Sequence, residues 1–399
     1  MAHDIPTRRS WVNLDTGALE DNFRLLRSLA PEGAECVAVV KADAYGHGLG
    51  ICAPAAARAG AQWLGVTSVE EGVAARAACP EARILIMCGA FPGQAAAVIA
   101  HRLTPVVWES WQIADLQAAA RAAGLGARAL AVHLEIDTGM SRQGVRSGDL
   151  KPVLAQIATS SPLRVEAVMT HLYASDEADL LRTAKQMKEL EQALSVIAPA
   201  LQPEWLSVGA SSALLGGTAA KIAALAARWN LRPMLRLGLA LYGVAPRFEP
   251  AFARGDEPAS LRRGWAELRP VLSWKSHVVS VREIPAGAEV GYNGTFVATE
   301  PMRVALVAAG YADGLDRRLS NRFSLLIRGQ RAPLVGRVSM DHCVVDVTEI
   351  EGVRPGDEVV LLGRQDGETI SAYDHADATG TIPWEVFTRI GSRVARIAE

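Results

Sequence analysis

Short apolar runs recur along the first part of the chain and predict the strands of a parallel sheet. The eight runs cover residues 36–41, 63–67, 83–87, 103–108, 129–136, 163–170, 205–208 and 235–242. Between them lie alanine-rich stretches with the spacing of amphipathic helices, such as 69–78, 109–123, 177–197 and 213–227. Near-continuous apolar strands that alternate with helices are typical of parallel strands buried on both faces.

Eight strand–helix units in about 230 residues favour a (β/α)8 barrel, which usually takes about 250 residues. A doubly wound sheet is the alternative, but the count of eight favours the barrel. After about residue 265 the chain changes to short β-rich segments joined by connectors rich in Gly, Pro and Asp. We therefore expect an α/β fold with a (β/α)8 barrel over residues 15–262 and a mostly antiparallel β domain over residues 263–399, on which a strand at 10–14 packs.

Composition narrows the class of protein. Half of the 399 residues are hydrophobic and 21% are charged, so the chain can bury a large core. A net charge of −2 argues against a nucleic-acid scaffold or a polybasic membrane binder. No apolar run reaches the roughly 18 residues of a membrane-spanning helix, and the polar start does not resemble a secretory signal. Five cysteines without a CxxC pair indicate reduced thiols and a cytoplasmic location.

Several polar side chains stand at the predicted strand ends, where the chemistry of a (β/α)8 barrel is located. Lys41 ends the first apolar run, and a partly desolvated lysine has a lowered pKa and can act as a base or form a Schiff base. The alternative is a surface lysine whose stem lies on apolar residues. Arg142 follows the fifth run, His171 ends the sixth, and Arg236 lies inside the eighth.

The small residues 209–212 open a helix after the seventh run, and free N–H groups at such a place favour a phosphate. A lysine, a phosphate site and an arginine able to meet a ring nitrogen fit a pyridoxal phosphate (PLP) enzyme. Barrel aldolases that use a lysine would show a similar pattern, so both remain open from position alone. No P-loop, HExxH, GxSxG or zinc-type spacing occurs, and we expect no metal site.

The motifs resemble those of the bacterial alanine racemase family, PLP enzymes with an N-terminal barrel and a C-terminal β domain. They keep the family's order over nearly the whole chain: VVKADAYGHG (39–48), DTGMSRQG (137–144), THLYASDE (170–177), RLGLALYG (236–243), EVGYNGTF (289–296), GYADGLDR (310–317), GRVSMD (336–341) and TIPWEV (381–386). The resemblance implies interconversion of L-alanine and D-alanine in the cytoplasm, with D-alanine supplied to peptidoglycan.

The resemblance also implies roles for single residues. Lys41 would hold PLP covalently and carry a proton on one face, and Tyr292 would carry a proton on the other. Because the family shares its sites across a homodimer, Tyr292 would serve the neighbouring subunit. Arg236 would face the pyridine nitrogen, His171 would lie against the ring, and Arg142 would contact both PLP and the substrate carboxylate. Tyr45, Ser212, Gly238 and Leu239 would hold the phosphate, and Met340, Asp341 and Tyr311 would contact the substrate or line its entrance.

Three positions depart from the family pattern. Glu135 stands where the family often has a carbamylated lysine that orients the arginine, and its carboxylate is expected to substitute as a fixed anion. Ser211 replaces an asparagine beside the phosphate, and Trp384 replaces a phosphate-contacting tyrosine. The Trp384 indole can donate one hydrogen bond but cannot accept one.

Other functions remain open at this point. A racemase of serine or of a broader range of amino acids would share the same motifs. PLP-dependent decarboxylases of basic amino acids resemble this architecture, but they carry a Cys-Asp pair where this chain has Met340 and Asp341. Non-catalytic PLP carriers resemble only the barrel and lack a β domain.

Overall fold

The computed structural model describes residues 9–157 and 161–399, which form two compact units. The barrel unit comprises Gly17–Ala44 and Leu49–Arg269. The C-terminal unit comprises Pro270–Glu399 together with Tyr45–Gly48 and the described part of Met1–Thr16. The boundary expected between residues 262 and 263 falls inside helix α11 (Ala259–Glu267), which the contacts keep whole within the barrel unit.

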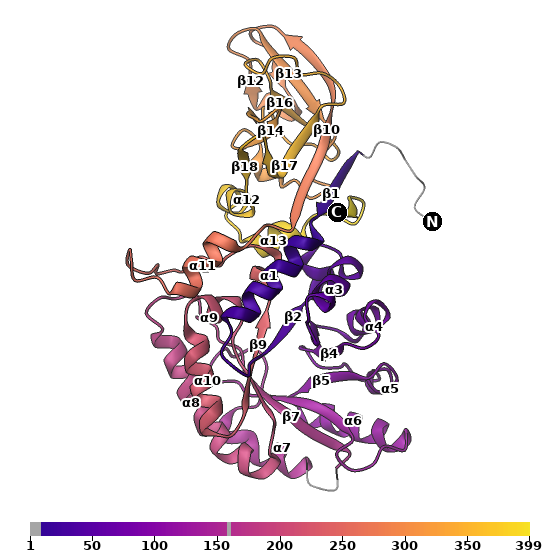
Figure 1. Cartoon of the computed structure of the whole chain (residues 1–399). Coiled ribbons are helices and arrows are strands. Elements are labelled where there is room, and N and C mark those ends of the chain that lie inside the picture. Colours follow the sequence, from indigo (N-terminus) through magenta and orange to yellow (C-terminus); the bar gives the residue numbers. More distant parts are fainter. Residues whose placement is uncertain (1–8, 158–160) are drawn as a thin grey trace. The chain divides into compact units, whose positions relative to one another are not determined.

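Eight parallel strands close into a barrel, which confirms the expected (β/α)8 architecture (Figure 1). Each strand pairs with the next along the chain, and the last pairs with the first. The strands are β2 (Glu35–Val39), β3 (Trp63–Val66), β4 (Arg83–Ile86), β5 (Leu103–Val107), β6 (Leu130–Glu135), β7 (Leu163–Met169), β8 (Trp205–Ser207) and β9 (Arg232–Leu237). All residues of β3 and β5 are buried, as expected for parallel strands that are covered on both faces.

Helices follow the strands along the chain. They are α1 (Thr16–Leu29), α3 (Leu49–Arg58), α4 (Val69–Ala78), α5 (Ala95–Ala100), α6 (Ser110–Ala122), α7 (Leu150–Gln156), α8 (Leu181–Leu201), α9 (Ser211–Leu215) and α10 (Thr218–Arg228). The start of α4 is an example of a helix end that the local sequence explains. The Ser68 side chain caps α4 by accepting a hydrogen bond from the Glu71 N–H.

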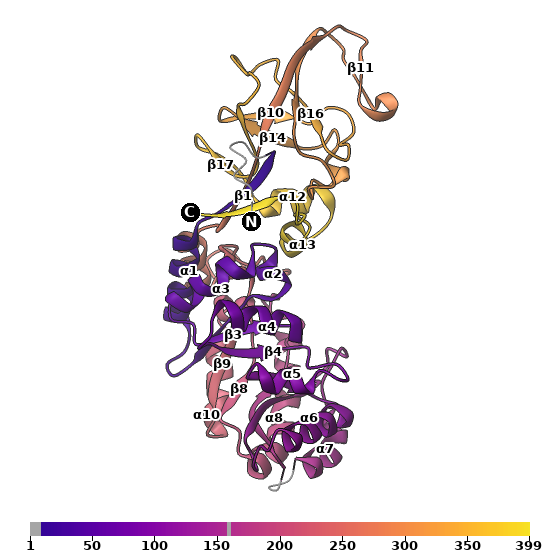
Figure 2. The same cartoon turned by 90° about the vertical axis from the view of Figure 1, so that its right-hand side faces the viewer.

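The C-terminal unit is built mostly from antiparallel strands, as expected. They are β1 (Ser10–Leu14), β10 (Leu272–Ile284), β11 (Glu289–Val290), β12 (Phe296–Val297), β13 (Met302–Val307), β14 (Ser324–Ile327), β15 (Gln330–Pro333), β16 (Cys343–Asp346), β17 (Glu358–Gln365), β18 (Glu368–Ile370) and β19 (Ala395–Ala398). The long strand β10 pairs with β1, β13 and β17. Strand β1 also pairs with β19 in parallel, so the two ends of the described chain lie side by side. In Figure 2 the short strand β11 lies away from the sheet that contains β10 and β14.

Two details differ from the pattern in the sequence. The eighth apolar run, 235–242, is not one strand, because β9 ends at Leu237 and residues Leu239–Tyr242 form a 3-10 turn. Gly238 lies between them with a non-strand conformation, φ −108° and ψ −104°. The C-terminal unit also contains two helices, α12 (Ala372–Thr379) and α13 (Pro383–Thr388). Among the described residues, no helix combines the length and apolar character needed to cross a bilayer.

Candidate active site

Lys41 lies two residues after the end of β2 and begins a short left-handed segment, labelled α2 (Lys41–Tyr45). The four residues after it, 42–45, have φ between 51° and 55°. Such a conformation costs an ordinary L-residue about 1–2 kcal/mol, so other contacts must hold it. The Ala42 N–H donates to Glu71 Oε1 at 2.6 Å, which ties the segment to the start of α4. The backbone that carries Lys41 is therefore fixed by the barrel.

The surroundings of Lys41 favour a neutral amine. The residue is half-buried, and desolvation lowers the pKa of its amine. The positive charges of Arg142 and Arg236 lower the pKa further, whereas negative charge on Cys88 or Glu71 acts in the opposite direction. A neutral amine is the form that attacks an aldehyde or accepts a proton.

Arg236 is buried at the end of β9, and its two terminal nitrogens are bonded to the protein. Nη1 donates to the Ser207 carbonyl at 2.8 Å and to Ser207 Oγ at 2.9 Å. Nη2 donates to the Thr170 carbonyl at 2.9 Å and to His171 Nδ1 at 3.2 Å. Among the described residues none accepts a hydrogen bond from Nε, so this donor remains for a ligand. Burial lowers the pKa of Arg236 to about 10, which leaves it charged at neutral pH.

His171 is an uncharged neighbour of Arg236. Because Nδ1 accepts from an arginine, the ring proton lies on Nε2. Burial, followed by the charges of Arg236, Arg142 and Lys41, lowers the pKa of His171 to about 3. The imidazole is therefore neutral throughout the physiological range and contributes no charge to the site.

Glu135 is buried at the end of β6 below the loop that carries Arg142. Its Oε2 accepts a hydrogen bond from Gln143 Nε2, and the same amide group donates to the Met87 carbonyl at 3.0 Å. Burial raises the pKa of Glu135 to about 7, although the Gln143 bond and the nearby arginines oppose the rise. Among the described residues no ion pair joins Glu135 to the exposed Arg142, so the direct partner of this carboxyl group is Gln143.

The serines after β8 differ in what their hydroxyl groups contact. Ser211 Oγ accepts hydrogen bonds from the backbone N–H groups of Gly238 and Ala240, both at 3.2 Å. It therefore holds the turn after β9. Ser212 Oγ lies 2.6 Å from Ser175 Oγ, and either hydroxyl can be the donor. The pair brings the end of the THLYAS motif to the start of α9.

Two further predicted residues, Tyr45 and Trp384, belong to the C-terminal unit. Tyr45 is buried, which raises the pKa of its hydroxyl. The next residue, Gly46, lies against α13, where a Cβ would come within 2.4 Å of the Phe387 carbonyl oxygen. Arg396 Nη2 donates to the Gly46 carbonyl at 2.9 Å. Trp384 also lies on α13, so the YGHG stretch packs against the helix that carries this tryptophan.

Tyr292 lies in the short turn between β11 and β12, with two thirds of its side chain exposed (67%). The preceding Gly291 has φ 72°, and its α-carbon packs close to the backbone of Arg337, which a Cβ would approach to 3.2 Å. The tyrosine motif is thus placed beside the GRVSMD motif.

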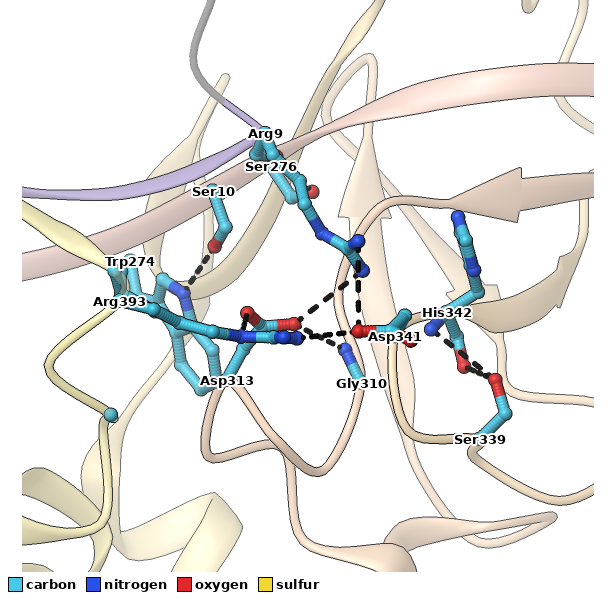
Figure 3. A network of polar contacts seen from close by, with 12 residues as sticks. Arg9, Ser10, Trp274, Ser276, Gly310, Asp313, Ser339, Asp341, His342 and Arg393 are labelled. Atoms are coloured by element: carbon cyan, nitrogen blue, oxygen red, sulfur yellow. Dashed lines mark hydrogen bonds and ion pairs between the residues drawn. The ribbon is translucent and has the colours of Figure 1, made fainter.

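The remaining three predicted residues lie on two adjoining loops. Tyr311 donates its N–H to the Ser339 carbonyl at 3.0 Å, next to Met340 and Asp341. Tyr311 and Met340 are both exposed, at 43% and 53%. Asp341 is bonded to Arg393 at 2.9 Å, a contact that Figure 3 shows.

The structure thus gathers the predicted residues in two groups. The barrel unit brings together Lys41, Glu135, Arg142, His171, Ser211, Ser212, Arg236, Gly238 and Leu239. The C-terminal unit carries Tyr45, Tyr292, Tyr311, Met340, Asp341 and Trp384. Their roles in binding and catalysis stay predictions. Within the described ranges no cluster of three or more His, Cys, Asp or Glu side chains suits a metal ion.

Sequence reasoning missed several residues that position this site. They are Ser207, Thr170, Ser175, Gln143 and Arg393. Gln143, Thr170 and Ser175 lie within motifs that the sequence had singled out, DTGMSRQG and THLYASDE, so these motifs were a signal for them. Ser207 and Arg393 lie outside the motifs, and their partners are far apart from them in the chain.

Comparisons with known proteins agree with the residues and the fold. Residues 14–246 match the family model "Alanine racemase, N-terminal domain", and residues 271–398 match "Alanine racemase, C-terminal domain". The alanine racemase of Sorangium cellulosum is 40% identical over 403 residues, covering 98% of each chain.

Solved structures are similar over the same length. The alanine racemase of Streptomyces lavendulae, described as D-cycloserine producing, is 32% identical with a TM-score of 0.86, covering 99% of this chain and 98% of that one. The alanine racemase of Bartonella henselae, solved with covalently bound pyridoxal phosphate, is 27% identical with a TM-score of 0.82, covering 98% and 100%. The chain therefore belongs to the alanine racemase family.

Proposed function

We propose that this protein is a PLP-dependent alanine racemase. The observation that carries the proposal is Lys41, half-buried at the end of the first barrel strand, where burial and two arginines lower the pKa of its amine. The likeness to alanine racemases over both domains supports the same reaction. When bound, PLP withdraws electrons from the substrate and so acidifies its Cα hydrogen.

The residues of the barrel unit suit PLP. Lys41 would hold the cofactor through its amine, and the Nε–H of Arg236 is a donor suited to a pyridine nitrogen. Since an arginine stays protonated, it would donate this bond without losing its proton. Ser212, Gly238 and Leu239 would hold the phosphate with Tyr45, and the indole of Trp384 would add at most one donor. We infer that Ser211 acts indirectly, because its hydroxyl is bonded to the Gly238 turn.

Two proton carriers would work on opposite faces of the substrate. Lys41, once free of the cofactor, would hold or return a proton on one face, and Tyr292 would do so on the other. Racemisation needs removal from one face and delivery to the other, which two fixed groups accomplish directly. Arg142 would bind the substrate carboxylate through its always charged guanidinium.

We further propose a homodimer in which Tyr292, Met340 and Asp341 serve the partner's site. Tyr292 and Met340 are large side chains that stay exposed in the single chain, and such residues are common in interfaces. A cytoplasmic enzyme that supplies D-alanine for peptidoglycan is the setting that we propose. The five cysteines are all free, which fits a reducing compartment.

The test is incubation of the purified protein and PLP with L-alanine in D₂O. We expect loss of optical rotation and deuterium at Cα of the D-alanine formed. Lys41→Ala is expected to abolish both signals, and Tyr292→Phe to lower the rate by about 100-fold or more. Retained rotation without deuterium would eliminate alanine as the substrate, and serine, lysine and arginine would then be tried with detection of CO₂.

A further inference from the structure

A network of four charged side chains in the C-terminal unit joins both ends of the described chain to the loops that carry Tyr311 and Met340 (Figure 3). Arg393 Nε donates to Asp313 Oδ1 at 2.6 Å, and its Nη2 donates to Asp341 Oδ1 at 2.9 Å. Arg9 lies 3.7 Å from the first carboxylate and 3.8 Å from the second. The two positive and two negative charges balance.

Asp313 is the buried centre of this network. Only 2% of its side chain is exposed, and its second oxygen accepts a hydrogen bond from the Gly310 N–H at 2.8 Å. Its backbone carbonyl also accepts from the Gly391 N–H at 2.9 Å, so the segment that carries Arg393 is attached to this loop twice. A buried carboxylate depends strongly on such partners, because it has lost its hydration.

The Asp313 loop in turn lies directly on the loop of Met340. The Ala312 N–H donates to the Met340 carbonyl at 3.0 Å. At Gly310 the two backbones approach so closely that a Cβ would lie 2.3 Å from the same carbonyl oxygen. Any shift of the Asp313 loop is therefore passed to the backbone of Met340 and Asp341.

We propose that Arg393 is a positioning residue that sets the substrate-contacting loops by bridging Asp313 and Asp341. This rests on the proposed function, in which Tyr311, Met340 and Asp341 meet the substrate. The bridge needs two donors in fixed directions, one on Nε and one on Nη2. A guanidinium supplies these, whereas a lysine has a single ammonium group.

The main variant is Arg393→Met, which keeps much of the stem and removes both donors. Arg393→Lys is the conservative variant and keeps the charge. Arg331→Met is the matched control, since Arg331 also bonds a carboxylate, that of Glu368, and is similarly exposed (48% against 42%). If Arg393→Met does not fold, Arg393→Met combined with Asp313→Asn removes the unpaired buried charge and is used instead.

Three quantities are measured: KM and kcat for alanine, hydrogen exchange at the Tyr311 and Ala312 amides, and PLP content. We expect Arg393→Met to raise KM about tenfold with a smaller change in kcat, because ground-state contacts are lost. Both amides should exchange about tenfold faster, because their carbonyl partners are no longer fixed. For Arg393→Lys, the KM and the exchange rates should lie between those of wild type and Arg393→Met. The control Arg331→Met should match wild type in KM and exchange, and the PLP content of every variant should match that of wild type.

An unchanged KM or unchanged amide exchange in a folded variant would overturn the proposal, even if its melting temperature fell, because the role would then be structural only. If the wild-type protein does not racemise alanine, the proposed function fails. The exchange measurement still decides whether Arg393 fixes the two loops.

Discussion

At the scale of single residues, burial decides which groups at the barrel mouth carry charge. It lowers the pKa of Lys41 and that of His171, whose ring therefore stays neutral. It raises the pKa of the Glu135 carboxyl to about 7. Burial also lowers the pKa of Arg236, but only to about 10, so Arg236 stays charged at neutral pH. The site therefore combines an amine of lowered pKa and a neutral imidazole with a charged guanidinium, which suits the proposed chemistry.

Glu135 provides a pH-dependent prediction at this scale. A carboxyl whose pKa rises from 4.5 to about 7 on folding keeps a proton that the unfolded chain loses between these values. The free energy of unfolding therefore falls as pH rises through this window, by at most about 3 kcal/mol for 2.5 pKa units. Glu135→Gln removes this dependence and can still accept from Gln143. The variant should gain stability over wild type between pH 4.5 and pH 8, measured by urea unfolding.

The control for this prediction is Glu351→Gln, which changes an exposed carboxylate in a turn. The difference in free energy of unfolding between Glu351→Gln and wild type should be the same at pH 4.5 and at pH 8. If the difference in free energy of unfolding between Glu135→Gln and wild type were also the same at both pH values, this would contradict the raised pKa of the Glu135 carboxyl.

At the scale of elements, the turns after the strands place the chemistry more than the strands do. The barrel strands are mostly apolar, and the site residues lie at or after the ends of β2, β6 and β9. The segment after β2 is left-handed over four successive residues, none of them glycine. Strain of this kind persists only where surrounding contacts enforce it. Here the side chain of Glu71 bonds the first strained amide.

Two substitutions at Ala42 test this strain. Glycine accepts φ 51° at no steric cost but loses more entropy on folding, so Ala42→Gly should stay within about 0.5 kcal/mol of wild type. A β-branched side chain fits this region poorly, and Ala42→Val should lose about 2 kcal/mol. The same alanine-to-glycine change at Ala118, in the right-handed helix α6, should cost about 1 kcal/mol. If Ala42→Gly and Ala118→Gly lost equal free energy of unfolding in chemical denaturation, this would refute the left-handed conformation at Ala42.

At the scale of the whole molecule, the predicted site residues are distributed over two units. The barrel unit holds Lys41, Arg142 and Arg236, and the C-terminal unit holds Tyr292 and the loops of Tyr311 and Met340. The two family models match the chain in the same order, at residues 14–246 and 271–398. A shared site in a homodimer would let one subunit's barrel work with the other subunit's β domain.

Mixed dimers test this sharing. In a heterodimer of Lys41→Ala and Tyr292→Phe, one site combines both defects and the other has neither. Random association of equal amounts makes half of the dimers mixed, so about a quarter of wild-type activity should return. The measurement is racemase activity after the two inactive proteins are co-expressed or allowed to exchange subunits. Each variant alone is the control, and an inactive mixture that contains heterodimers would show that each site uses one chain only.

The sequence by itself determined the eight barrel strands, the β-rich second part and the polar residues at strand ends. Strands buried on both faces must be apolar along their length, so their pattern is local and readable. Lys41, His171 and Arg236 stood out because each interrupts or ends such a run. Sequence similarity to a family then implied their roles.

Only the tertiary structure decided the partners of these residues. Two of the four acceptors of Arg236 are backbone carbonyls, which every residue type carries and no motif marks. Gln143 rather than Arg142 bonds Glu135, because the loop folds back over β6. Arg393 reaches Asp313, 80 residues away, because the end of the chain packs against that loop. Hydrogen bonding between distant segments depends on how the chain folds in space, and hydrophobic periodicity along the sequence contains no record of it.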